Sequence, residues 1–267
     1  MSESLLQEQI AAATAYEELF VPALFQQWAP LVVKAAHIHP GNRVLDIACG
    51  TGVLAREAAA QVGSSGHVAG LDMTPGMLEV ARRIAPAIAW REGTADALPF
   101  PDQSFDAAVS QFGFMFFPDR QKSLQEMLRV LVPGGRLAIA VWDALDNIPA
   151  IADEVALLER SAGTQAADAL RAPFVLGDKN ELAQLAQEAG LASFTVQTHE
   201  GTARFPSIRS LVEADLRGWL PVMGVLLEES KIQQILAEAE VALRRHTNEQ
   251  GHAVFPISAH IMSGVKT

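Results

Sequence analysis

The 267-residue sequence contains one cysteine, Cys49. A single cysteine cannot form a disulfide within the chain, and it cannot supply the several thiolates that a cysteine-based metal cluster requires. We identify no neighbouring base in the sequence that would activate Cys49 as a nucleophile. The sequence therefore predicts no disulfide, no metal site and no thiol chemistry.

Basic residues are also scarce. The sequence has 20 Lys and Arg against 31 Asp and Glu, which gives a formal net charge of −11. A protein whose substrate is DNA or RNA usually carries a basic face that contacts phosphates. The short basic clusters are limited to Arg82-Arg83 and Arg244-Arg245, and so we expect no nucleic-acid partner.

Long hydrophobic runs are absent as well. No segment approaches the roughly 18 uninterrupted apolar residues that suggest a membrane-spanning helix. The first residues, which include Glu3, are acidic and lack the basic and apolar regions of a secretory signal. We therefore expect a cytoplasmic protein without membrane insertion, long enough for one domain that carries an elaboration.

Residues 44–52 form the most informative segment that the chain does contain. An apolar run carrying Asp46 is followed by the turn Gly50-Thr51-Gly52 and then by a helix-like stretch. Such an arrangement can receive a small ligand, because glycine lets the backbone approach it and the amino end of the helix favours an anionic group. At this point an ordinary tight turn and a nicotinamide-binding loop, which Gly50-x-Gly52-x-x-Ala55 also fits, both remain open.

A second acidic residue follows 26 positions after Asp46. Residues 68–72 have the pattern of a buried strand that ends in Asp72, where a carboxylate can accept both hydroxyls of a ribose. Met73 comes next, and Thr74-Pro75 has the pattern of a helix start with Thr74 as its cap. These residues together favour a ligand that contains a ribose.

Three further segments complete a series of motifs: residues 88–100 with Ala95-Asp96-Ala97, residues 104–112, and residues 131–142 with Pro133-Gly134-Gly135. In this order and spacing, residues 43–142 resemble the class I S-adenosylmethionine-dependent methyltransferases, in the broad group that includes the ubiquinone/menaquinone-biosynthesis methyltransferases. Five linked motifs are far more specific than one glycine loop. A nicotinamide-dependent enzyme gives no role to Asp96 or to residues 133–135.

The resemblance implies a set of residues that bind S-adenosylmethionine. Asp72 would hold the ribose, Met73 would pack on the adenine, and Asp96 would accept a hydrogen bond from the adenine amine. Ala48 departs from the family, which often has glycine there, but its small side chain is tolerated at a strand end. The implied residues are Asp46, Ala48, Gly50, Gly52 and Ser110 at the methionine end, Asp72 at the ribose, and Met73, Met77, Ala95, Asp96 and Ala97 at the adenine.

The family fold is α/β, a Rossmann-like seven-stranded sheet in the order 3-2-1-4-5-7-6 with the last strand antiparallel, helices on both faces and a helical cap. In this chain the last two strands are expected at residues 194–199 and 253–265. The cap insertions would leave the carboxyl edge of the sheet, where ligands bind in open α/β sheets. The predicted parts are 1–42, a helical segment covering the cofactor cleft; 43–146, the cofactor-binding core; 147–178 and 201–251, the cap; and 179–200 and 252–267, the remaining core.

This topology sorts the candidate catalytic residues. His252, His199 and Asp143 are expected on the ligand side, where one of them could act as a general base. His260 is expected too far along the last strand. The histidines expected at the opposite edge are His37, His39 and His67.

Apolar residues after the fourth and fifth strands are candidates for an acceptor-binding wall. Phe112, Met115 and Trp142 lie near the reactive end of the implied cofactor, and Tyr16 lies in the segment that covers it. We therefore predict an S-adenosylmethionine-dependent methyltransferase, without a metal, that acts on a small, partly apolar molecule. A nicotinamide-dependent oxidoreductase and a non-catalytic cofactor-binding protein are the alternatives, and the acceptor atom and oligomeric state stay open.

Overall fold

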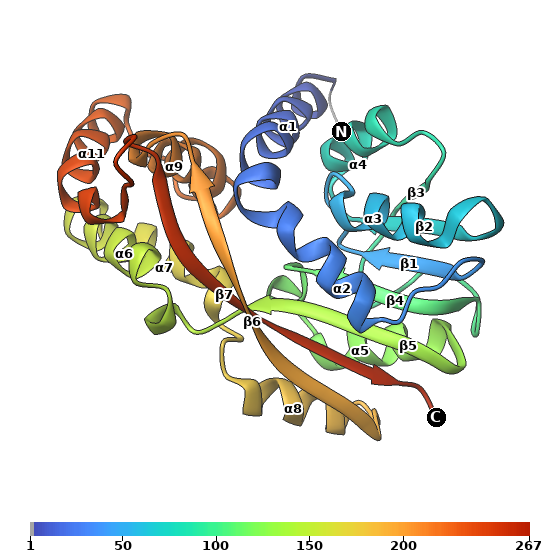
Figure 1. Ribbon diagram of the computed structural model, residues 1–267. Helices are drawn as coiled ribbons and strands as arrows, with labels where there is room; N and C mark the ends of the chain where they lie inside the picture. Colours follow the sequence, from blue (N-terminus) through green and yellow to red (C-terminus); the bar gives the residue numbers. More distant parts are fainter. Residues whose placement is uncertain (1–2) are drawn as a thin grey trace.

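A seven-stranded sheet in the order β3-β2-β1-β4-β5-β7-β6 runs through the computed structural model, which describes residues 3–267 (Figure 1). The first two residues of the predicted segment 1–42 lie outside this description. β7 is antiparallel to both of its neighbours, and the other pairs are parallel, which confirms the predicted sheet. The strands are β1 (Arg43–Ile47), β2 (His67–Asp72), β3 (Ala89–Glu92), β4 (Phe105–Gln111), β5 (Leu131–Trp142), β6 (Ser193–Phe205) and β7 (Ala253–Val265).

Four helices connect the strands of the core: α3 (Val53–Val62), α4 (Pro75–Ile84), α5 (Arg120–Val130) and α8 (Lys179–Glu188). Asp119 caps α5 and Asp178 caps α8, since each side chain accepts a hydrogen bond from a backbone N–H of the first turn. Thr74 precedes α4 as predicted but makes no capping hydrogen bond with its side chain. The inner strands β1, β4 and β5 are almost wholly buried because helices cover both faces of the sheet.

The N-terminal segment is helical but irregular. It consists of α1 (Glu3–Ala15), the π-helical η1 (Tyr16–Phe25), the short η2 (Gln26–Trp28) and α2 (Ala29–Ala35). Pro22 lies inside η1, where its missing N–H favours a departure from the α-helical hydrogen-bond pattern. α1 packs on α4 through Ile10, Ala13 and Val80. The segment therefore lies across the same side of the molecule as α3 and α4, as Figure 1 shows.

The strands β6 and β7 extend beyond the carboxyl end of β5. β6 was expected to end at His199, but it continues to Phe205. Trp142, the last residue of β5, pairs with Ala259, so the first six residues of β7 pair with β6 alone, beyond the edge of the sheet. The predicted boundary at residue 201 therefore falls inside a strand. Buried residues on one face, such as Phe205 and Phe255, anchor this two-stranded ribbon to the cap.

The cap helices gather around the outer end of the ribbon (Figure 1). They are α6 (Pro149–Ala162), α7 (Thr164–Arg171), α9 (Ile208–Ala214), the π-helical η7 (Asp215–Trp219), α10 (Leu220–Val222) and α11 (Glu229–Ala242). Among residues 3–267, no helix has both the length and the apolar character needed to cross a membrane.

Candidate functional site

The loops after β1 and β4 meet at the carboxyl edge of the sheet, where the strand order reverses. A Cβ added to Gly113 would lie 2.5 Å from the Cβ of Ala48, so the two backbones approach closely. Ala48 and Phe112 both have a left-handed backbone, with φ of 56° and 55°. Ligands of open α/β sheets bind at such a reversal. The left-handed φ of Ala48 also explains why a glycine suits this position.

The two glycines of the first loop have different surroundings. Gly50 has a φ of 54°, and a Cβ added there would meet no atom within 4 Å. Gly52 has a φ of 90°, and a Cβ there would lie 2.3 Å from the indole of Trp90. Open space for a ligand therefore adjoins Gly50, whereas Gly52 allows close packing against Trp90. A side chain at Gly52 would therefore meet the indole of Trp90 before it could displace a ligand.

Asp72 connects the end of β2 to the glycine loop. Its Oδ2 accepts a hydrogen bond from the N–H of Gly50, and its Oδ1 accepts one from the N–H of Thr74, both at 2.8 Å. Burial raises the pKa of its carboxyl, although these N–H groups partly offset the effect. Each carboxylate oxygen can accept a further hydrogen bond, so Asp72 keeps the capacity to bind two ribose hydroxyls.

Three polar side chains at or next to the predicted methionine end are buried and have oxygens without a hydrogen-bond partner in the described chain. Asp46 is 1% exposed, and neither of its oxygens makes a well-formed hydrogen bond within residues 3–267. Burial raises its pKa well above the usual value, and the N–H of Ala55 offsets this only in part. The hydroxyls of Ser110 and Thr51 are likewise buried without a partner in the described chain. Such groups mark a place where a polar ligand fits, because buried polar atoms are normally hydrogen-bonded.

Among the predicted adenine residues, Met73 lies in the loop after β2 and Met77 in the first turn of α4, whereas residues 95–97 lie in the loop after β3. Met73 is 69% exposed, which leaves its side chain free to cover a ring. Asp96 is half-buried, and a hydrogen bond from the Thr94 hydroxyl holds its pKa below the usual value. Met77 is half-buried, Ala95 is buried and Ala97 is exposed.

The predicted acceptor wall forms one aromatic cluster with the N-terminal segment. Phe112 stacks on Trp142 with ring centres 3.7 Å apart and planes 10° apart. Phe25 contacts both rings, and Met115 is buried in the same hydrophobic core. Tyr16 packs on Phe25, with ring centres 5.3 Å apart. These side chains therefore meet at the carboxyl ends of β4 and β5, largely shielded from water.

Tyr16 also lies near the predicted cofactor acids. Its pKa is raised by burial first, then by the negative charge of Glu17 and by those of Asp72 and Asp46. Tyr16 therefore packs on the aromatic cluster and is near enough to the acids beside the glycine loop for their charge to raise its pKa.

Asp143 and His260 belong to one buried network. Nε2 of His260 lies 3.1 Å from Oδ1 of Asp143, and the ring also contacts Thr198 and the carbonyl of Gly177. His260 was expected too far along the last strand to reach the site. It pairs with Val141, one residue before the end of β5, and its ring meets Asp143.

The oxygens of Asp143 are already engaged. Oδ2 accepts a hydrogen bond from Ser258, and Oδ1 accepts bonds from Asn147 and the N–H of Ala144. Burial alone would raise its pKa, but these hydrogen bonds outweigh it and hold the pKa below the usual value. Asp143 is thus held in one orientation as an acceptor.

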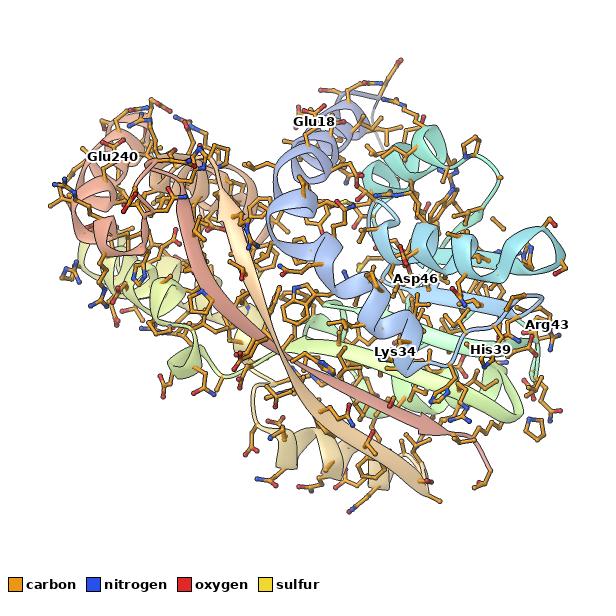
Figure 2. The ribbon with its side chains drawn as sticks, in the orientation of Figure 1. Glu18, Lys34, His39, Arg43, Asp46 and Glu240 are labelled. Carbon is orange, nitrogen blue, oxygen red and sulfur yellow. The ribbon has the colours of Figure 1, made fainter. Side chains whose placement is uncertain are left out.

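His199 lies at the carboxyl edge of the sheet, where the ligand side was expected, but His252 lies beyond this edge. His199 is half-buried and pairs with Ala259, at the level of Trp142. His252 is exposed at the outer end of the ribbon, seven positions from Ala259, or roughly 23 Å along a strand. Figure 2 shows His39 near Arg43, at the opposite end of β1 from the ligand loop.

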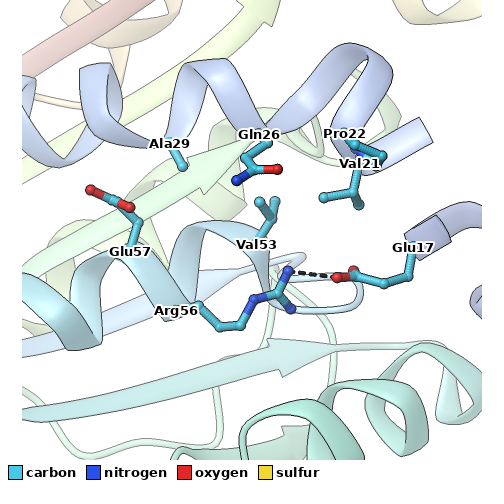
Figure 3. A pocket seen from close by; sticks show the side chains of 8 residues that line it. All are labelled: Glu17, Val21, Pro22, Gln26, Ala29, Val53, Arg56 and Glu57. Carbon is cyan, nitrogen blue, oxygen red and sulfur yellow. Dashed lines mark hydrogen bonds and ion pairs between the residues drawn. The ribbon is translucent and has the colours of Figure 1, made fainter. Parts of the chain in front are cut away.

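Two charged pairs were not anticipated from the sequence. Glu17 of η1 and Arg56 of α3 form an ion pair at 2.7 Å. They line a cavity of about 440 Å³ between the N-terminal segment and α3 (Figure 3). In the cap, Glu154 of α6 and Asp215 of η7 are buried together. The signal for the second pair was an acid at an otherwise apolar position of each helix.

Comparison with known proteins relates the chain to methyltransferases. A family model described as a methyltransferase domain matches residues 44–135. A demethylmenaquinone methyltransferase of Paenarthrobacter aurescens is 36% identical over 190 residues, which cover 66% of this chain and 72% of that protein. A 2-phytyl-1,4-naphtoquinone methyltransferase of Synechococcus elongatus is 43% identical over 122 residues, which cover 43% of this chain and 52% of that protein. The chain spans about half the length of the first of these curated relatives.

Solved structures share the fold. The YcgJ protein of Bacillus subtilis has a TM-score of 0.59 at 23% identity, with 90% of this chain and 98% of that chain covered. A phosphoethanolamine N-methyltransferase 2 of Haemonchus contortus, in complex with S-adenosylhomocysteine, has a TM-score of 0.60 at 17% identity, with 96% of this chain and 57% of that chain covered. At these identities the likeness concerns the fold alone.

Proposed function

Because the chain belongs to the class I S-adenosylmethionine-dependent methyltransferases, we propose that it transfers a methyl group from S-adenosylmethionine to a small, partly apolar molecule. Two relatives are named for naphthoquinone or menaquinone methylation. A reduced naphthoquinone is therefore the first acceptor class to test. The alternatives of a nicotinamide enzyme and a non-catalytic binding protein are not favoured by these relatives.

The observation that carries the proposal is the group of unsatisfied polar atoms beside the open space at Gly50. Asp46 and Ser110 would bind the methionine end of the cofactor, and Asp72 would hold the ribose. Met73, Met77, Ala95, Asp96 and Ala97 would surround the adenine, with Ala48 and Gly52 shaping the loop. The cofactor supplies an electrophilic methyl group on a sulfonium.

On the acceptor side, Phe112, Met115, Trp142 and Tyr16 would exclude water and orient the acceptor toward the methyl group. The cap helices of residues 147–178 and 206–251 would cover it. Alignment in a water-poor site supplies much of the catalysis in such transfers. Of the three predicted bases, His199 has the most suitable position, since it is half-buried at the level of Trp142. Asp143 is held by other hydrogen bonds, and His252 lies far out along the ribbon.

Calorimetry with S-adenosylhomocysteine and with NAD tests the cofactor, and mass spectrometry of reduced naphthoquinones incubated with S-adenosylmethionine tests the transfer. We expect binding of S-adenosylhomocysteine, no measurable binding of NAD, and a product heavier by one CH2 unit, because the methyl group replaces a hydrogen. Tighter binding of NAD, or no binding of S-adenosylhomocysteine, would overturn the proposal. Cofactor binding without methylation of quinols would overturn the acceptor class and leave the cofactor assignment intact.

A further inference from the structure

The ion pair between Arg56 and Glu17 adjoins the predicted methionine end of the cofactor site. Arg56 lies one helical turn after Gly52, and its side chain folds back so that Nη1 donates to the carbonyl of Thr51 at 2.7 Å. Its Nη2 donates to Oε1 of Glu17, also at 2.7 Å. Figure 3 shows this contact bridging α3 and the N-terminal segment. Arg56 therefore reaches both the glycine loop and the segment that covers it.

This ion pair satisfies Glu17 only in part. The second oxygen of Glu17, Oε2, is buried and has no hydrogen-bond partner within residues 3–267. Both side chains are partly buried, with 25% of Arg56 and 19% of Glu17 exposed. The attraction within such a pair is largely offset by the loss of hydration. Arg56 can therefore release Glu17 and bind the carboxylate of a ligand instead with little loss of free energy.

Several other titratable side chains around the glycine loop are acidic. Asp46 and Asp72 lie on its inner side, and Glu17 and Glu57 line the cavity. Among the eight described residues that line this cavity, Arg56 carries the only positive charge. A ligand with a carboxylate at this end needs a compensating cation, to which the amino end of α3 adds only a partial positive charge.

With Asp72 on the ribose, the amino-acid tail of the cofactor extends toward the loop after β1. We propose that Arg56 binds the carboxylate of this tail, and that Glu17 occupies Arg56 when the cofactor is absent. The inference rests on the proposed function and names a further binding residue of the same site. It makes Glu17 a competitor of the ligand. Removal of Arg56 should therefore weaken binding of the ligand, and removal of Glu17 should strengthen it.

Calorimetry of two ligands tests the assignment. S-adenosylhomocysteine carries the amino-acid tail, whereas 5′-methylthioadenosine has the same nucleoside and sulfur without it. Arg56→Gln should weaken S-adenosylhomocysteine binding about 10- to 100-fold, the range for a hydrogen bond to a charged group, and should leave methylthioadenosine binding unchanged within about twofold. Glu17→Gln should strengthen S-adenosylhomocysteine binding and leave methylthioadenosine binding unchanged.

A control variant separates this contact from general charge effects. Arg82→Gln removes an arginine of α4 whose side chain is 47% exposed, and it should alter neither affinity. Arg56→Lys keeps the charge and should retain part of the selectivity for the tail. If Arg56→Gln fails to fold, Glu17→Gln and Arg56→Lys still decide.

Three results would overturn the inference. Equal loss of both ligands in Arg56→Gln would mean that the ion pair only maintains the loop. Weaker S-adenosylhomocysteine binding in Glu17→Gln would mean the same. If the unmodified protein bound neither ligand, the proposed function would fail and this inference with it, a result distinct from the other two.

Discussion

Gly50 and Gly52 flank the same turn but have different neighbours, and this difference predicts different effects of the same substitution. Gly50→Val adds atoms to open space, with a cost of about 1–2 kcal/mol for the left-handed backbone. We expect it to abolish binding of S-adenosylhomocysteine while the protein still unfolds cooperatively. Gly52→Val adds atoms against Trp90 and should lower the free energy of unfolding by a further 1–3 kcal/mol, about the cost of overpacking.

Calorimetry and thermal melts of the two variants check this prediction. Normal ligand binding by Gly50→Val would show that the open space is not part of the site. Equal stability of the two variants would show that Trp90 moves aside without cost.

Asp72 supports both the loop and the expected ribose. Asp72→Ala should weaken S-adenosylhomocysteine binding by about 1–3 kcal/mol, because it leaves hydrogen-bonding groups without partners. Asp106→Ala is a matched control, since Oδ2 of Asp106 also accepts a backbone N–H, that of Arg43, at the other edge of the sheet. Isothermal titration of both variants measures the difference. Unchanged affinity in Asp72→Ala, or an equal loss in both, would contradict the placement of the ribose.

A general base is needed only if the acceptor is a hydroxyl or a protonated amine. In that case one of the variants His199→Ala, His252→Ala and Asp143→Ala should have a single-turnover rate lower by about 10²–10⁴-fold. Its affinity for the cofactor should be unchanged. His39→Ala, exposed at the opposite edge, is the control. Near-normal rates in all three variants would leave alignment by the aromatic cluster as the main contribution.

At the scale of elements, the cap contains a buried acid pair that joins α6 to η7. Glu154 is 0% and Asp215 7% exposed, and no positive charge among the described residues offsets them. Burial raises the pKa of both carboxyls, that of Asp215 to about 7. Near neutral pH the pair therefore keeps at least one proton, and the cap helices meet without two facing negative charges.

This pair predicts that the cap becomes less stable as the pH rises. The folded protein holds a proton on Asp215 that the unfolded chain, with a pKa of about 4, releases. The resulting stability is complete below about pH 4 and is lost as the pH rises through about 7. Asp215→Asn lacks this pH dependence. As the pH rises from 5 to 8, its unfolding free energy should therefore gain on the order of 1–3 kcal/mol relative to that of the unmodified protein.

Urea unfolding at several pH values measures this gain. Asp168→Asn, on the exposed face of α7, should show no such gain. If the difference in unfolding free energy between Asp215→Asn and the unmodified protein were the same at pH 5 and pH 8, this would contradict a shared proton in the cap.

At the scale of the whole molecule, the N-terminal segment and the sheet edge enclose the predicted site between them. Tyr16, Glu17 and Phe25 of η1 contact or face the glycine loop and the aromatic cluster. A ligand that binds only the folded protein at 100 times its dissociation constant adds about 2.7 kcal/mol to stability. We expect saturating S-adenosylhomocysteine to slow amide hydrogen exchange most in η1 and in the loop after β1.

Hydrogen-exchange mass spectrometry tests this expectation. α8, which packs on β6, β7 and α5, is an internal control and should change little. Equal protection of α8 and η1 would indicate global stabilisation, and no protection of η1 would show that the segment does not cover the ligand.

The resemblance of residues 43–142 to the methyltransferase family supplied the sheet order. Sequence alone determined the glycine loop and the acid at the end of β2. These features depend on short segments, such as residues 44–52 and 68–72, whose apolar patterns and turn residues specify local structure directly. Because parallel strands align their carboxyl ends, the local patterns also predicted the edge at which the site is expected.

Only the tertiary structure decided the remaining contacts, because they join segments far apart in the chain. His260 meets Asp143 through the pairing of β7 with β5, and an extension of β6 and β7 beyond the sheet changes which residue lies at its edge. The packing of Trp90 on Gly52 and the ion pair between Glu17 and Arg56 depend in the same way on how separate elements meet. Such packing follows from the register and position of whole elements, which no local pattern of residues specifies.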